Sequence, residues 1–109
     1  MLVRQTEVIV TRRYRQVQVD GNSMLPTLVD GDLVLARIGV PAHPDDLVLV
    51  RWPQRPQQLS VKRAAWPEGD GWFVVGDNAA ASTDSNHLGP AQVLGVIRWR
   101  LWPKPHRVR

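Results

Sequence analysis

The sequence of 109 residues contains no cysteine, which excludes disulfide bonds and thiolate chemistry. Its three histidines are scattered along the chain and have no thiol partners, so they do not form the spacing of a zinc site. We therefore expect neither a metal ion nor a cofactor.

Long apolar segments are also missing. The longest uninterrupted runs, such as LVLV at residues 47–50, are far shorter than the roughly 20 residues that span a bilayer as a helix. The first residues, MLVRQTEVIVTRRYRQ, mix charged with apolar positions and lack the continuous apolar core of a secretory signal. The chain length suits one domain, so we expect a single soluble domain over residues 1–109 in the cytoplasm.

Lysine is scarce in this basic chain. The formal net charge is +4 with 14 basic residues, yet Lys62 and Lys104 are the only lysines. The basic tail, residues 104–109, is most simply a solvated surface, while contact with phosphates or with an anionic membrane surface stays open. Lys62 differs because it lies inside an apolar strand pattern, and an ammonium group, unlike guanidinium, can lose its proton.

Alternation of apolar and polar residues recurs along the chain and predicts an all-β fold. The alternating segments are residues 6–10, 15–19, 32–38, 46–52, 58–66, 71–75 and 91–102. Helix should be limited to short turns near residues 23–28 and 90–94. In the turn WPEGDGW at residues 66–72, Gly69 and Gly71 are expected at positive φ.

Five tryptophans are many for this length. Trp72 and Trp99 lie in strand patterns, which favours core or sheet-face positions. Trp52, Trp66 and Trp102 each precede a proline at the end of a strand, where they could line a peptide groove or rest on lipid.

Ser23 follows a strand pattern, and a serine hydroxyl becomes a nucleophile only when a base takes its proton. His87 with Asp84 is one candidate, but nothing around His87 indicates burial. Lys62 is the other: strand parity places it beside Ser60 and Ala64, and burial of that face would lower the lysine pKa from about 10.4 by as much as 3 to 5 units. A surface lysine with a solvated amine is the plainer interpretation.

The polar segment at residues 74–90 is rich in short hydrogen-bonding side chains. It is either an ordinary loop or a support for the base. In the second case Ser82 would exchange a proton with the Lys62 amine and align it with Ser23, while Asp77, Asn78 and Asp84 would fix the shape of the turn.

Three segments, taken in order, carry a resemblance. They are GNSMLPTLVDGD at residues 21–32, VKRAAW at residues 61–66 and GDNAAASTDSNHLGP at residues 76–90. Together they resemble the type I signal peptidase family of Ser/Lys proteases, and within it the small soluble nickel-type superoxide dismutase maturation proteases. The resemblance runs from about residue 17 to residue 103 and implies a small signal-peptidase and LexA-like β-barrel with little helix.

The resemblance also implies roles for individual residues. Ser23 would be the nucleophile, with its backbone amide binding the oxyanion, and Lys62 the general base. Ser82 matches the serine that orients the lysine, and Asp84 the acid that supports the same segment. Met24 and Pro26 would shape the wall beside the nucleophile.

Two positions depart from the family pattern. Gly21 stands where some members have a serine that completes the oxyanion hole, and Asn86 stands where an arginine usually pairs with the acid. The second departure leaves the rigidity of the Asp84 turn in question.

The substrate that the resemblance implies is a precursor protein, with the N-terminal pro-segment of a nickel superoxide dismutase as the first candidate. A leader peptidase acting on other precursors stays an alternative. A self-cleaving repressor is disfavoured, because the chain before Ser23 is too short for a helix-turn-helix domain. A non-catalytic module that binds peptide or nucleic acid would explain the basic charge but neither Ser23 nor Lys62, so no nucleic acid is expected as partner.

Overall fold

The computed structural model describes residues 13–109, and these form one antiparallel sheet with little helix, as the alternation predicts. The predicted strand at residues 6–10 lies outside the described residues. The strands are β1 (Tyr14–Gln18), β2 (Leu33–Ile38), β3 (Leu47–Arg51), β4 (Leu59–Glu68), β5 (Gly71–Val75), β6 (Gln92–Trp102) and β7 (His106–Arg107). Two short helical segments, η2 (Ala79–Ala81) and α1 (Ser85–Leu88), complete the fold.

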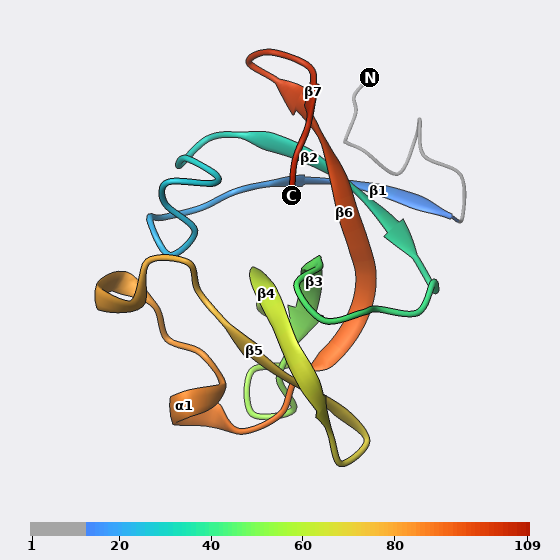
Figure 1. The fold of residues 1–109 in the computed structure, drawn as a ribbon, viewed down its shortest axis with the longest axis vertical. Helices are drawn as coiled ribbons and strands as arrows, with labels where there is room; N and C mark the ends of the chain where they lie inside the picture. Colours follow the sequence, from blue (N-terminus) through green and yellow to red (C-terminus); the bar gives the residue numbers. More distant parts are fainter. Residues whose placement is uncertain (1–12) are drawn as a thin grey trace.

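The strands follow the order β1-β2-β6-β3-β4-β5, with β7 paired to the end of β6. The long strand β6 pairs with β2 over one part and with β3 over another, and both ladders contain register shifts. Such irregularities bend a sheet and increase its twist. In Figure 1 the sheet accordingly curves along β6, with β1 and β2 on one side of the molecule and β3, β4 and β5 on the other.

The interior is filled mainly by aliphatic side chains of β2, β3 and β6. β3 is buried on both faces over its first four residues, which explains its unbroken apolar sequence. The loop between β1 and β2 adds Val19, Met24 and Leu28 to the same core. Burial of these three side chains anchors the loop that carries Ser23.

Two sequence predictions about turns need correction. Residues 90–94 are not helical, because Gly89 ends α1 at a positive φ and Ala91 then pairs with Trp72 through two backbone hydrogen bonds. Gly71 does not have a positive φ, whereas Gly69 does. At Gly71 the reason for glycine is space, since a Cβ would lie 2.3 Å from the carbonyl oxygen of Ala91.

The structure decides between the positions that the sequence left open for the tryptophans. Trp99 is exposed on the outside of β6, as are Trp66 and Trp102 at the ends of their strands. Trp66 stacks on Phe73 across the β4–β5 hairpin, with ring centroids 4.5 Å apart. Trp52 is buried, and its indole N–H donates to the carbonyl of Gly89 at 2.8 Å.

Candidate active site

Ser23 lies in the loop of residues 19–32, which closes on itself between β1 and β2. Val19 N–H donates to the Asp32 carbonyl, and Gly31 N–H donates to the Val19 carbonyl, each at 2.8 Å. Gly21 has a positive φ of 88°, a conformation that glycine adopts at little cost, and its N–H donates to Asp30. The loop is therefore held in shape by its own backbone before any contact with the rest of the site.

Lys62 lies on the face of β4 that also carries Ser60 and Ala64, as strand parity predicts, and the structure shows that its side chain is buried there. Only 4% of its surface is exposed, and its amine donates a hydrogen bond of 3.3 Å to the Ser82 hydroxyl. Burial lowers the pKa of the Lys62 amine below its ordinary value, although the nearby negative charge of Asp84 acts in the opposite direction. A lysine in this state is a stronger candidate for a base than a solvated one.

The chain of contacts continues from Ser82 to Asp84, whose carboxylate accepts the Ser82 hydroxyl at 3.1 Å. Asp84 is also the N-cap of α1 and accepts N–H groups from Asn86 and Gly76. Burial raises the pKa of this carboxyl, but the hydrogen bonds outweigh burial and hold it below its usual range. Asp84 is thus fixed as an anion that orients Ser82 toward Lys62.

Asn86 explains how this turn is held without the arginine of the family pattern. Its backbone N–H and its side-chain amide both donate to the same oxygen of Asp84, at 3.0 and 3.1 Å. Two donors from one residue hold this carboxylate oxygen in place, without the positive charge that an arginine would add. The question that this departure raised about the rigidity of the turn is answered by the amide.

Gly76 is a site residue that sequence reasoning did not single out beyond its place in the GDN segment. A Cβ at this position would lie 2.3 Å from the Ser82 hydroxyl and 2.7 Å from the Ser23 carbonyl oxygen. Only glycine lets the Ser23 loop and the Ser82 segment approach so closely. A glycine between a strand and a polar turn was the available signal.

Asp77 and Asn78 connect the Ser23 loop to β4. Asp77 accepts two hydrogen bonds from the guanidinium of Arg63 and one from the Thr27 hydroxyl. These bonds outweigh the effect of burial and lower the pKa of Asp77.

Asn78 donates its backbone N–H to the Ser23 carbonyl at 2.8 Å and its side-chain amide to the Asn22 carbonyl at 3.0 Å. Both residues therefore fix the Ser23 loop, whereas the sequence suggested only that they shape their own turn.

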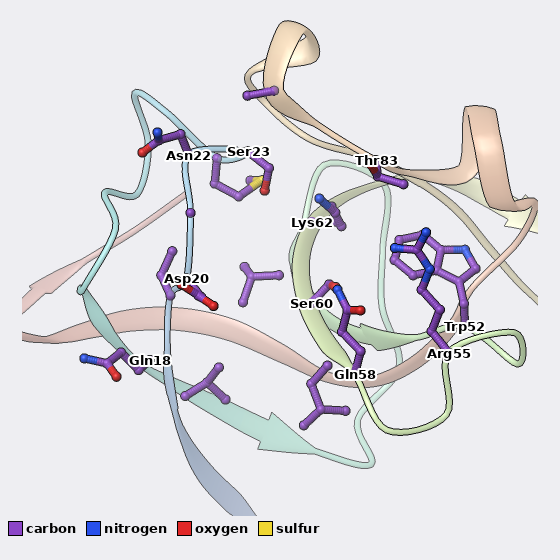
Figure 2. A pocket seen from close by; sticks show the side chains of 17 residues that line it. Gln18, Asp20, Asn22, Ser23, Trp52, Arg55, Gln58, Ser60, Lys62 and Thr83 are labelled. Carbon is purple, nitrogen blue, oxygen red and sulfur yellow. The ribbon is translucent and has the colours of Figure 1, made fainter.

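A pocket of about 350 Å³ lies between the Ser23 loop and the first half of β4. Figure 2 shows Ser23 and Lys62 at this pocket, with Gln18, Asp20 and Asn22 on one side and Trp52, Arg55 and Thr83 on the other. No hydrogen bond joins the Ser23 hydroxyl to the Lys62 amine within residues 13–109. Catalytic hydrogen bonds are often long before substrate binds, so the separation does not remove the pair from consideration.

Of the two predicted wall residues, Met24 lines the pocket and Pro26 does not. Pro26 is exposed because Met24 and Leu28 turn their side chains into the core and leave the intervening residue outside. His87 is not at the pocket either. Its imidazole is mostly exposed and its Nδ1 lies 3.9 Å from Asp84, so it does not form a triad with Ser23.

None of the helices within residues 13–109 is long and apolar enough to cross a membrane. Across the same residues, no cluster of His, Cys, Asp and Glu side chains is suited to hold a metal ion.

An all-β fold that brings a serine, a buried lysine and a supporting Ser–Asp pair to one pocket is the arrangement expected of a signal-peptidase-like protease. The chain matches the family described as Peptidase S24-like over residues 4–98. It is 35% identical over an alignment of 130 positions, gaps included, to Mitochondrial ATP-independent inner membrane protease subunit 1a of Arabidopsis thaliana, with 86% of this chain and 75% of that protein covered. Subunit 1b of the same plant is 31% identical over an alignment of 114 positions, gaps included, covering 76% of this chain and 67% of that protein. The chain therefore belongs to the peptidase S24-like family and is a signal-peptidase-like protease.

Proposed function

We propose that the protein is a serine endopeptidase in which Ser23 is the nucleophile and Lys62 the general base. The observation that carries this proposal is the buried Lys62 amine, held by Ser82 at the pocket that Ser23 also lines. A base must be neutral to accept a proton, and burial favours the neutral amine. Asp84, kept anionic by its hydrogen bonds, acts through Ser82 as a positioning residue.

The proposed reaction has two halves. The neutral Lys62 amine takes the Ser23 proton while the Ser23 oxygen attacks the substrate carbonyl carbon, and the resulting ammonium protonates the leaving amine as the peptide bond breaks. Water then attacks the acyl-enzyme with Lys62 again as base, which releases the acid and restores Ser23. The Ser23 N–H has no hydrogen bond partner within residues 13–109 and so is free to bind the oxyanion.

We propose an N-terminal segment of a precursor protein as the substrate, with the pro-segment of a nickel superoxide dismutase as its first candidate and the cytoplasm as the site of action. The candidate rests on the resemblance of residues 76–90 to the maturation proteases. The relatives named as inner membrane proteases support peptide cleavage in general. Cleavage of a different precursor is therefore the alternative within the same activity.

The test mixes the purified protein with a nickel superoxide dismutase precursor and follows the intact mass of both. The wild type should remove only the N-terminal segment, and Ser23→Ala and Lys62→Met should each be slower by at least about a hundredfold. Met keeps the length and apolar stem of Lys62, so the variant should fold. Equal rates in Lys62→Met and wild type would refute the dyad. Cleavage of another precursor but not of this one would refute only the substrate.

A further inference from the structure

Arg55 lines the pocket but has no role in the proposed reaction. It lies in the loop between β3 and β4 and lines the pocket together with Trp52. Figure 2 shows both side chains on the side of the pocket opposite Asp20 and Asn22. A cation therefore stands at one wall of the pocket in which the substrate would lie.

The guanidinium of Arg55 has no hydrogen bond or ion pair within residues 13–109. The other cations near the site are accounted for. Arg63 is bound to Asp77, and the amine of Lys62 is held by Ser82 with a lowered pKa. Among the residues that line the pocket, Arg55 is therefore the cation whose side-chain N–H donors are not bound to another described residue.

The loop that carries Arg55 is fixed rather than loosely tethered. The buried indole of Trp52 donates to the Gly89 carbonyl at 2.8 Å, and the Gln54 side chain donates to the Leu88 carbonyl at 2.7 Å. Within the loop, Arg55 N–H donates to the Trp52 carbonyl and Gln58 N–H donates to the Arg55 carbonyl, each at 3.0 Å. The loop is thus docked on the end of α1, which follows directly on Ser82 and Asp84. A preorganised backbone lowers the entropic cost of using the side chain for binding.

We propose that Arg55 is a specificity-determining residue that binds a carboxylate side chain of the substrate close to the scissile bond. This inference rests on the proposed function, because it takes the pocket to be the substrate site. A guanidinium presents a planar set of donors that matches a carboxylate. Asp20 on the opposite wall disfavours an acid at the other side of the pocket, so the preference should hold at one substrate position and not along the whole peptide.

Binding to Ser23→Ala tests the proposal without chemistry. Fluorescently labelled alanine-rich peptides would carry a single Asp, Lys or Ala, moved through every position, and their affinities would be measured by anisotropy at low and high salt. At one position Asp should bind about fivefold more tightly than Lys, and high salt should weaken the difference. Adding Arg55→Glu should reverse the preference at that position. Arg107→Glu makes the same charge change on the exposed strand β7 and should leave it unaltered.

The outcomes separate this proposal from the proposed function. Absence of any Asp preference in Ser23→Ala, or a preference that survives in Arg55→Glu, would overturn the role of Arg55. Failure of the catalytic proposal would show elsewhere, as equal cleavage by the wild type and the Lys62→Met variant.

Discussion

Two opposing effects set the protonation of Lys62, the residue on which the proposed chemistry depends. Burial on β4 penalises the ammonium form and lowers its pKa, while the anionic Asp84 favours the ammonium and raises it. Burial is the larger effect. The Lys62 amine of the unfolded chain binds its proton more tightly than that of the folded protein. As pH rises, Lys62 of the folded enzyme therefore becomes neutral below the ordinary pH range of lysine titration.

The first prediction is a pH profile. The value of kcat/KM should rise with pH through an inflection below the ordinary lysine pKa of 10.5. In Asp84→Asn the inflection should move to lower pH, because the charge that stabilises the ammonium is gone. The measurement is the cleavage rate of a precursor over a pH series. A shift to higher pH would contradict this account of Lys62.

His87→Gln is the matched control for that profile. Besides Lys62, His87 is a titratable side chain close to Asp84, since its Nδ1 lies 3.9 Å from the carboxylate. Its imidazole is mostly exposed. Its removal should leave the inflection in place. If the inflection disappeared instead, histidine and not lysine would govern the rate.

At the scale of elements, the site depends on how closely two loops approach across Gly76. The second prediction is that Gly76→Ala lowers kcat by at least about tenfold, because the new Cβ would collide with the Ser82 hydroxyl and the Ser23 carbonyl. The fold should lose about 1 to 3 kcal/mol, the usual cost of overpacking. Cleavage kinetics and urea unfolding measure the two effects.

Gly71→Ala separates the two effects. Its Cβ would collide with the Ala91 carbonyl at the β4–β5 hairpin, away from the pocket, so a similar loss of stability is expected with kcat close to wild type at a temperature where both variants are folded. Equal losses of kcat in the two variants would mean that Gly76 matters only for stability.

For the whole molecule, two carboxylates with lowered pKa values, the buried Asp84 and the partly buried Asp77, connect stability to pH. The pKa values of Asp77 and Asp84 lie below their ordinary value in the folded state, so the stability that each contributes is present above the ordinary Asp pKa of 3.8 and is lost as pH falls through the lower folded value. The protein should therefore unfold more readily in acid.

The third prediction concerns Asp77→Asn. At neutral pH the variant should be less stable by about 1 to 3 kcal/mol, because the charged pair with Arg63 is lost and the guanidinium keeps a weaker partner. Its Tm should then depend less on pH than that of the wild type between neutral pH and acid. A parallel pH dependence in the two proteins would show that Asp77 does not contribute to acid unfolding. Asp46→Asn alters a carboxylate of similar exposure that contacts His43 instead of an arginine, and it should change the profile little.

The positions of many strands along the chain follow from the local sequence. The segment GWFVV coincides with β5, and the apolar run at residues 47–50 falls within β3, because alternation and β-branched residues act through nearest neighbours. The helical turns at residues 79–81 and 85–88 were missed because both are too short to show a period. The second also depends on the cap that Asp84 provides. For Trp99 the sequence left a core or a sheet-face position open, because parity alone does not tell which face of a strand is covered, and the structure places it on the exposed face of β6.

The sequence by itself determined the all-β class and the order of the segments that carry Ser23, Lys62 and Ser82. It also determined that Lys62 and Arg63 point to opposite faces of β4. Only the tertiary structure decided that the Lys62 face is the buried one and that Asn86 holds Asp84 in place of an arginine. It also decided that Asp77 and Asn78 fix the loop of Ser23. The physical reason is range: a strand pattern arises from adjacent residues, whereas desolvation and hydrogen-bond partners come from segments far apart in the chain, such as Asn22 and Asn78, which are 56 residues apart.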